Sequence, residues 1–353
     1  MMEEKKYGLG IIGYGGMARH HHLNLAINDR LDVIGVYDIA QERIDFAKAN
    51  GLEGFASQEA LLADPRVDIV LVAAPNNFHK VISIAALKAG KHVICEKPVT
   101  MDSDELVEIM KVAKECGRIF TIHQNRRADR DYLMVKQSIA DGLIGKPFSI
   151  ESRVLGSRGV PEGWRQYKVA GGGMMLDWGV HLIDQIMQMV DEKVVSVYTH
   201  MFSIKYPEVD DYFKLLLRFE SGISAHIEVG TCNYITLPRW YVTGESGAIQ
   251  IDDWNCKGKI VRAKETTIQW EEEIVYTLAG PTKTMAPRPK DTVEEIEMTI
   301  PNTDYTAYYQ NIIDAIEGKA DILVKPEQAM RVMKVMEAAF LSNTTGDAIK
   351  VNI

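Results

Sequence analysis

A glycine-rich turn near the start of the chain constrains its fold most. The turn is Gly13-Tyr14-Gly15-Gly16-Met17-Ala18, and it follows a strand predicted over Tyr7–Ile12. In this pattern Gly13 permits a tight turn and Gly15 lets the backbone approach a pyrophosphate. Ala18 stays small where a helix must pack on the strand. We therefore predict that Gly13, Gly15, Gly16, Met17 and Ala18 hold a dinucleotide at the N-terminus of that helix.

Asp38 supports this prediction and bears on the choice of cofactor. It ends the second predicted strand, Val33–Tyr37, 20 positions after Ala18. A carboxylate there can accept hydrogen bonds from a ribose diol. It would repel a 2′-phosphate, and the nearest positive charge in the sequence is Arg43. NAD is therefore expected, with NADP the less favoured alternative.

Strand-like and helix-like segments alternate through the first third of the chain. The run 67–74, apolar except for Asp68, is typical of a parallel strand buried on both faces. Alternation at this spacing predicts a doubly wound parallel sheet with right-handed crossovers. Its further predicted elements are helices 16–28, 41–50, 76–89 and 103–116 and strands 91–95 and 119–123.

The pattern changes after about residue 125. We predict an NAD-binding domain over 1–125 and a substrate-binding and oligomerisation domain over 126–353. The second has helices 131–140 and 174–190, strands 194–204, 212–219, 223–232, 239–243 and 248–251, a surface loop 279–290, and closing helices 304–316 and 326–341. This rhythm suits an antiparallel or mixed sheet with one packed face and one face free for a partner. The closing helices could dock back on the first domain.

Charge and cysteine usage exclude several classes of partner. The 353-residue chain has a net charge of −9 and no basic tract, so neither nucleic acid nor an anionic membrane is an expected partner. No apolar stretch approaches the roughly 20 residues that span a bilayer. The four cysteines form no CxxC pair, and the charged segment 1–6 leaves no room for a signal peptide. A cytoplasmic protein is expected.

Two segments carry candidate reacting groups. Lys97, in Glu96-Lys97-Pro98, follows a predicted strand at the sheet edge where ligands bind. Asp177 precedes His181 by four positions, so on a helix both side chains share one face. Oxidation of an alcohol needs a base for the hydroxyl proton, and histidine suits this task. The alternatives are a solvated lysine and either a helix-surface pair or two metal ligands. Because no third ligand stands out, no metal is expected.

The histidines near the nucleotide turn have less specific predicted roles. Pro75, Asn76 and His79 open a helix beside the expected cleft, and we include them with Glu96 and Lys97 among the cofactor-site candidates. For His79, local capping by Asn76 and contact with a nucleotide edge are equally open. The run His20-His21-His22 points in three directions on a helix, so exposed or interdomain histidines are expected there.

Aromatic and basic residues suggest where a substrate lies. Trp164, Arg165 and Trp178 flank the glycines 171–173, and aromatic faces suit the C–H face of a pyranose. Packing at a domain interface is the alternative for both tryptophans. Asn125 and Arg126 follow the last predicted strand of the first domain. Arg126 or Arg127 could bind a substrate carboxylate, or pair only with Asp129 and Asp131.

These motifs, in this order, resemble the glucose–fructose oxidoreductase/inositol dehydrogenase/rhizopine catabolism (Gfo/Idh/MocA) family. The resemblance rests on 13–18, Asp38, 96–98, 142–147 and 171–184 and covers essentially the whole chain. It implies a Rossmann domain followed by an α/β domain with a large open, predominantly antiparallel sheet that often mediates oligomerisation. It also implies that Lys97, Asp177 and His181 are the catalytic residues, with NAD(P) as cofactor and sugars or cyclitols as substrates.

The expected activity is NAD-dependent interconversion of a secondary hydroxyl and a ketone on a sugar, glycoside or cyclitol. His181 is the expected base, Lys97 steadies the reacting oxygen, and Asp177 orients His181 or a neighbouring hydroxyl. Segment 171–184 looks most like members that act on glycosides, including those that oxidise C3 of a glucosyl group. Two alternatives remain: a redox-neutral enzyme that recycles NAD during glycoside cleavage or elimination, and a non-catalytic NAD or sugar sensor. A homo-oligomer is expected.

Overall fold

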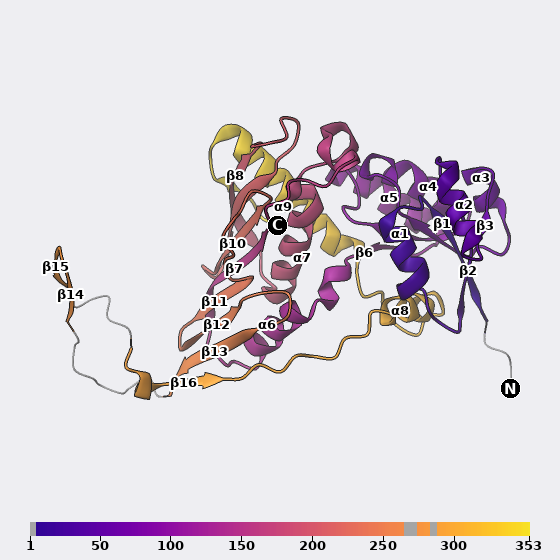
Figure 1. The fold of residues 1–353 in the computed structure, drawn as a ribbon. Coiled ribbons are helices and arrows are strands. Elements are labelled where there is room, and N and C mark those ends of the chain that lie inside the picture. Colours follow the sequence, from indigo (N-terminus) through magenta and orange to yellow (C-terminus); the bar gives the residue numbers. More distant parts are fainter. Residues whose placement is uncertain (1–4, 265–273, 283–287) are drawn as a thin grey trace.

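Two large sheets with their helices make up the body of the protein in the computed structural model (Figure 1). The structure describes residues 5–264, 274–282 and 288–353. A two-stranded hairpin, β14 (Val275–Thr277) with β15 (Gly280–Thr282), lies away from this body in Figure 1. The predicted loop 279–290 is therefore wrong at 280–282, and 283–287 lie outside the described residues.

The first sheet has six parallel strands in the order expected of a dinucleotide-binding domain. The order is β3 (Glu53–Gly54), β2 (Leu31–Tyr37), β1 (Tyr7–Ile12), β4 (Ile69–Val72), β5 (His92–Glu96) and β6 (Phe120–His123). All five pairings are parallel. Every residue of β1 and β4 is buried, because helices cover both faces. The predicted doubly wound sheet is confirmed.

The helices of this domain follow their sequence signals closely. They are α1 (Gly16–His20) with a π-helical turn (His21–Leu25), α2 (Gln41–Ala49), α3 (Gln58–Ala63), a 3-10 turn (Asn76–Phe78) leading into α4 (His79–Lys88), and α5 (Ser103–Cys116). In α5 the Asp102 carboxylate caps the N-terminus by accepting the Glu105 N–H at 2.8 Å. Gly117 ends the helix with a left-handed φ of 60°. Local chemistry therefore sets both ends of α5, where the sequence placed them.

The second sheet has nine strands and is mostly antiparallel. Its order is β16 (Val293–Ile296), β13 (Gly258–Ala263), β12 (Gly247–Ile251), β11 (Trp240–Gly244), β7 (Pro147–Leu155), β10 (Ser224–Gly230), β9 (Tyr212–Phe219), β8 (Val194–Phe202) and β17 (Ile349–Lys350). Among the described strands of this second sheet, only β7 and β10 pair in parallel. The predicted open, predominantly antiparallel sheet is confirmed, although β7, β13, β16 and β17 were not predicted.

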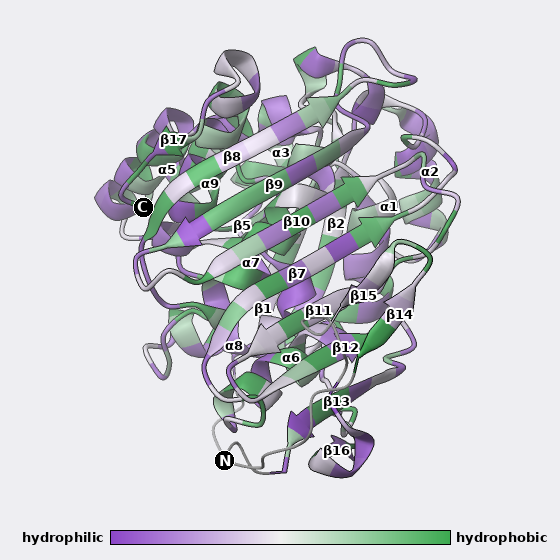
Figure 2. Cartoon of the chain, turned by 90° about the vertical axis from the view of Figure 1, so that its left-hand side faces the viewer, coloured by the Kyte–Doolittle hydropathy of each residue, from purple (hydrophilic) through white to green (hydrophobic). Residues whose placement is uncertain are grey.

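Helices cover only one face of this sheet. In Figure 1, α6 (Arg130–Ala140), α7 (Val180–Met189) and α9 (Pro326–Thr345) lie between the large sheet and the first domain. Burial alternates along β9, where Phe213, Leu215, Leu217 and Phe219 face these helices. The opposite face, in front in Figure 2, carries mixed polar and apolar residues, and no described helix lies over it.

The helix α8 (Ala307–Ile316) belongs to the packing of the first sheet despite its late position in the chain. Its Tyr309, Ile312 and Ile313 share one hydrophobic cluster with Leu9 and Ile11 of β1. The helix α9 instead packs mainly on β8 and α7. None of the described helices combines the length and apolar composition needed to cross a membrane.

Candidate active site

The candidate site lies at the carboxyl edge of the parallel sheet. The strand order reverses between β1 and β4, and ligands of such sheets bind in the crevice beyond this point. Gly13 follows β1, Asp38 follows β2, and Lys97 follows β5. The topology thus brings the predicted nucleotide turn and the predicted lysine to one edge.

The glycine turn has the shape that a dinucleotide requires. Gly13 has a φ of 87°, and a Cβ there would lie 2.6 Å from the backbone nitrogen of Ala74, so only glycine fits. At Gly15 and Gly16 a Cβ would meet nothing within 4 Å. This open space adjoins the first residue of α1, where backbone N–H groups favour a phosphate. Met17 follows, and Ala18 is fully buried. The turn therefore fits the pyrophosphate of a dinucleotide.

Asp38 fastens this turn to the end of β2. Its Oδ2 accepts the N–H of Tyr14 at 2.6 Å and its Oδ1 accepts the N–H of Ala40 at 2.9 Å. Arg43 also contacts Oδ2, through Nη1 at 3.2 Å. A cation therefore sits directly against the carboxylate. The sequence showed Arg43 as the nearest positive charge, but only the fold shows that it reaches Asp38, from the first turn of α2.

Pro75, Asn76 and His79 line the same edge, but His79 fits neither of its predicted roles. The Nδ2 of Asn76 donates to the carbonyl of Gly171 at 2.9 Å, so Asn76 joins the two domains instead of capping. His79 is 1% exposed, and its two ring nitrogens each lie 2.9 Å from a backbone carbonyl, of Ala74 and Pro98. Burial lowers the pKa of His79, so a neutral ring can donate to only one of these carbonyls. The ring is enclosed between the two carbonyls and is not free for a nucleotide.

Lys97 and Asp177 meet across the cleft. The Nζ of Lys97 donates to Oδ1 of Asp177 at 3.0 Å and to its main-chain oxygen at 2.8 Å. The other carboxylate oxygen, Oδ2, lies 3.2 Å from Nε of Arg165. Burial raises the pKa of Asp177, but Lys97 and Arg165 together outweigh burial and hold that pKa below its usual value. Asp177 is therefore ionised beside two cations.

His181 lies beside this pair without contacting Asp177. Its Nδ1 is buried and has no hydrogen-bond partner among the described residues. Burial, reinforced by Lys97 and Arg126, holds the pKa of His181 well below its usual value, so the ring is neutral. No hydrogen bond joins Asp177 to His181 among the described residues. Asp177 lies in a π-helical turn (Met175–Gly179), and its carboxylate pairs with Lys97 and Arg165 instead.

Glycines 171–173 allow two backbone segments to pack directly on each other beside the site. A Cβ at Gly172 would lie 2.2 Å from the carbonyl oxygen of Arg165, so the backbone of that segment packs directly on the glycine. Gly173, with a φ of 101°, donates its N–H to the same carbonyl at 3.1 Å. These contacts place Arg165 where it reaches Asp177.

Asp210 supports this wall and was not found from the sequence. Its buried carboxylate accepts the N–H of Met175 at 2.7 Å, at the start of the turn that carries Asp177. Burial raises the pKa of Asp210 to about 6. Its sequence context, a polar loop before β9, gives no signal of this long-range contact.

Glu96 does not face the cofactor site as predicted. Its Oε1 accepts hydrogen bonds from His21 Nε2 and His123 Nδ1, both at 2.8 Å, and His21 Nδ1 lies 2.6 Å from the Tyr309 hydroxyl. His21 is thus fully buried, contrary to the expected exposed or interdomain position. The ligand atoms of His21, Glu96 and His123 lie within 4.8 Å of one another, close enough to share a metal ion, but hydrogen bonds already join them.

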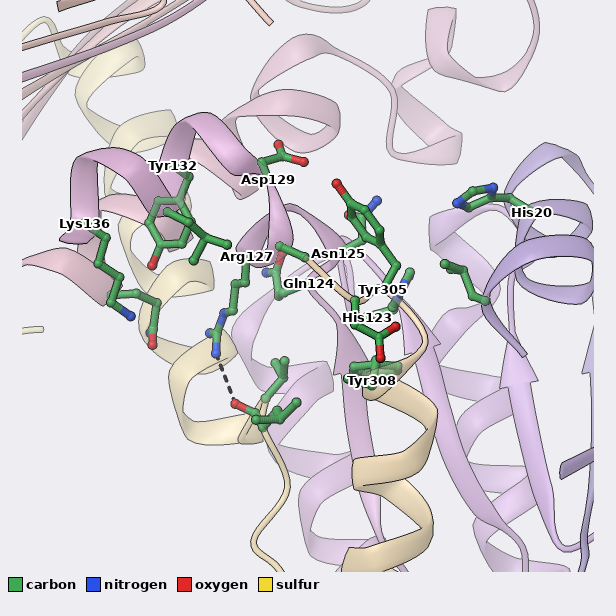
Figure 3. Close-up of a pocket in the computed structure, with 18 residues that line it drawn as sticks. His20, His123, Gln124, Asn125, Arg127, Asp129, Tyr132, Lys136, Tyr305 and Tyr308 are labelled. Atoms are coloured by element: carbon green, nitrogen blue, oxygen red, sulfur yellow. Dashed lines mark hydrogen bonds between the residues drawn. The ribbon is translucent and has the colours of Figure 1, made fainter. Parts of the chain in front are cut away.

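The two arginines after β6 have different environments. Arg127 forms a two-pronged ion pair with Asp184, at 2.7 and 2.6 Å, so it is not free for a substrate carboxylate. Its Nη1 also lies 3.3 Å from the carbonyl of Leu323, the dashed line in Figure 3. Arg126 pairs with Asp129 at 3.0 Å and stacks over the Trp178 ring at 4.0 Å. Asn125 Oδ1 and Arg126 Nε are buried without a partner among the described residues.

A cavity of about 370 Å³ lies beside this segment, and Figure 3 shows its lining. The lining includes Asn125, Arg127 and Tyr308, but none of Lys97, Asp177 and His181. The cavity therefore does not contain the reacting groups. Trp164 is not part of this lining, and the Arg165 guanidinium carbon is 4.5 Å from its ring centre.

Comparison with known proteins agrees with this architecture. Residues 7–124 match the family described as "Oxidoreductase family, NAD-binding Rossmann fold" (Gfo/Idh/MocA), and residues 132–250 match the "GFO/IDH/MocA C-terminal domain". The crystal structure of an NAD-binding protein from Listeria innocua has a TM-score of 0.95 and 43% identity, covering 99% of this chain and 100% of that one.

Several curated relatives have named activities, among them two that act on a cyclitol and on a glucoside. The scyllo-inositol 2-dehydrogenase (NADP(+)) IolW of Bacillus subtilis is 28% identical, over 95% of this chain and 93% of its own. The D-glucoside 3-dehydrogenase of Escherichia coli is 29% identical, over 55% of this chain and 57% of its own.

Proposed function

The chain belongs to the Gfo/Idh/MocA oxidoreductase family, and we propose that it interconverts a secondary hydroxyl and a ketone on a sugar, glycoside or cyclitol with NAD. One observation carries the proposal. The Lys97–Asp177 ion pair and the neutral His181 gather at the edge of the sheet where the glycine turn leaves space for a pyrophosphate. A site for NAD or sugar sensing alone would not need proton-transfer groups there.

The residues divide the proton chemistry between them. Bound NAD supplies the hydride acceptor, at C4 of its nicotinamide. His181 is neutral, so it can take the hydroxyl proton of the substrate as the ketone forms. Lys97 donates a hydrogen bond to the same oxygen and stabilises the charge that develops on it. Asp177 holds Lys97 in place and presents a second acceptor to a neighbouring hydroxyl.

We propose NAD over NADP because the Asp38 carboxylate occupies the end of β2, where a 2′-phosphate would lie. Arg43 offsets part of this repulsion, since it already contacts Oδ2 of Asp38. The preference is therefore proposed as moderate. Kinetics with both cofactors test it directly.

We also propose a glycoside, oxidised at C3 of a glucosyl group, as the substrate. Segment 171–184 and the similarity to the D-glucoside 3-dehydrogenase support this choice. A panel of free sugars, inositols, glycosides and uronic acids, followed by NADH absorbance, tests it. Net NADH formation with glycosides supports the proposal. Cleavage without net NADH supports a redox-neutral enzyme, and NAD binding without turnover supports a sensor.

We propose that the chain forms a homo-oligomer through the uncovered face of the large sheet (Figure 2). Tyr198 of β8 and Tyr241 of β11 are exposed on this face among polar residues, and exposed aromatic side chains favour association. Light scattering after gel filtration tests this. A cytoplasmic location is our further proposal, supported by four free cysteines, which suit a reducing compartment.

A further inference from the structure

We propose that Trp254, with Arg126, forms a second subsite that binds the part of a glycoside beyond the oxidised ring. This inference rests on the proposed function and narrows its substrate class to glycosides whose aglycone is itself a ring, such as a disaccharide. Trp254 lies in the turn between β12 and β13 and had no predicted role.

A continuous wall of rings joins His181 to Trp254. The ring centres of His181 and Trp178 are 5.8 Å apart and meet edge to face. The ring centres of Trp178 and Trp254 are also 5.8 Å apart. His181 is buried, Trp178 is half-buried and Trp254 is 50% exposed. The wall therefore leads from the reacting groups outward to solvent.

Arginines cover Trp254 from inside the protein. The guanidinium carbons of Arg239 and Arg126 lie 4.8 and 5.3 Å from the centre of a Trp254 ring. Arg239 is itself buried and paired with Asp131 at 3.2 Å, so it is a fixed support. Half of the Trp254 surface nevertheless remains exposed, so the residue is accessible to a ligand.

Hydrogen bonds to Asp253 hold the turn that presents Trp254. Among the described residues, Cys256 is the only one other than glycine with a positive φ, at 63°. The Asp253 side chain accepts the N–H of Asn255 at 2.9 Å, and the main-chain carbonyl of Asp253 accepts the N–H of Cys256 at 3.1 Å. A non-glycine residue in this conformation is strained, and such strain is concentrated at functional sites. Here the left-handed Cys256 buries its side chain and leaves Trp254 pointing outward.

The chemistry of this wall suits a second sugar ring. An indole face packs against the C–H face of a pyranose, and a guanidinium donates to its hydroxyls. The Arg126 side chain is 27% exposed, and its guanidinium carbon lies 5.3 Å from the centre of a Trp254 ring, within reach of the hydroxyls of a sugar bound there. A free inositol or monosaccharide held at His181 would leave Trp254 without a contact. A disaccharide would reach it with its second ring.

The test compares two substrates on the same enzyme. We measure kcat/KM with NAD for methyl glucoside and for a glucose disaccharide, on wild type, Trp254→Ala, Trp254→Phe and a control, Val107→Ala, at an exposed position on α5. Loss of one aromatic stacking contact corresponds to about a tenfold effect. Trp254→Ala should lower kcat/KM for the disaccharide about tenfold and leave methyl glucoside within about twofold. Trp254→Phe should recover part of the loss.

Each outcome has a separate meaning. Equal losses on both substrates, or no loss on either, with an active wild type overturn the subsite and leave the proposed function intact. A wild type that oxidises neither substrate overturns the proposed glycoside substrate and the subsite with it, whereas NADH formation with a free sugar or an inositol would keep the proposed function. Calorimetric binding of the disaccharide to the NAD-loaded Lys97→Ala protein, with and without Trp254→Ala, gives a second readout. Unchanged affinity there would also overturn the subsite.

Discussion

Lys97 and Asp177 join the two domains through one ion pair, with 3.0 Å between Nζ and Oδ1. Lys97 also donates to the main-chain oxygen of Asp177 at 2.8 Å, which fixes the direction of the ammonium group. Arg165 holds the other carboxylate oxygen. The pair is therefore a positioned unit at the domain boundary, and it provides the sharpest test of the proposed chemistry.

Replacing Lys97 by alanine should abolish most of the turnover without unfolding the protein. The hydrogen bond to the reacting oxygen disappears, and loss of such a group costs about 10²- to 10⁴-fold in kcat. Fluorescence titration with NAD should show cofactor binding unchanged, since the glycine turn lies elsewhere. Asp177→Asn serves as the matched control: it keeps the shape but loses the charge, so its loss should be smaller. Full turnover in Lys97→Ala would refute the assignment.

The pH dependence of kcat/KM tests His181. A base must be neutral to accept a proton, and burial holds the pKa of His181 well below its usual 6.5. Activity limited by this group should therefore be flat from pH 6.5 upward and should fall only at lower pH. Stopped-flow rates between pH 5 and 8 measure the profile. An acid limb centred at or above pH 6.5 would contradict the neutral, buried ring.

Asp38 should control the choice of cofactor. In Asp38→Asn the amide oxygen can still accept the N–H of Tyr14, but the negative charge is lost. We expect kcat/KM for NADP to rise about tenfold relative to NAD, because repulsion of the 2′-phosphate is removed. In the Asp38→Asn background, adding Arg43→Ala should reduce NADP use, since Arg43 is then the nearest cation. A wild type that prefers NADP would reverse our proposal.

Because of Asp210, the free energy of unfolding should fall as the pH rises from 3.8 to about 6. The unfolded carboxyl loses its proton near pH 3.8, whereas burial raises the folded pKa to about 6. Between these values the folded state binds more protons, so the free energy of unfolding falls with rising pH, by about 3 kcal/mol in total. Asp210→Asn removes this contribution. Urea unfolding from pH 4 to pH 7 should show wild type losing stability relative to Asp210→Asn. The same pH dependence of the free energy of unfolding in the two proteins would contradict a raised pKa of Asp210.

The sequence was sufficient for features encoded by local chemistry or by periodicity. The turn 13–18, the capped helix α5 and the alternating strand β9 all lie where they were predicted. Strand β7 escaped prediction because its pattern mixes charged and apolar residues, and its burial comes from both neighbours in the sheet. The prediction of the site from the sequence failed at contacts that only tertiary structure determines. Asp177 pairs with Lys97 and Arg165 and not with His181, and Asp210 and Trp254 reach the site from loops with no motif.

Two adjacent histidines, one buried and one exposed, test how much the hydrogen bonds around Glu96 contribute to stability. His21 is buried and donates to Glu96, whereas His20, one residue earlier, is exposed. His21→Ala leaves the buried Glu96 carboxylate with one imidazole donor fewer and leaves the Tyr309 hydroxyl unpaired. We expect the free energy of unfolding to fall by about 2–3 kcal/mol, measured by urea denaturation, with His20→Ala near zero. Equal effects of the two variants would refute the network. Wild type dialysed against a chelator should unfold at the same urea concentration as before, because hydrogen bonds join these groups; a clear drop would instead show that a metal ion holds them.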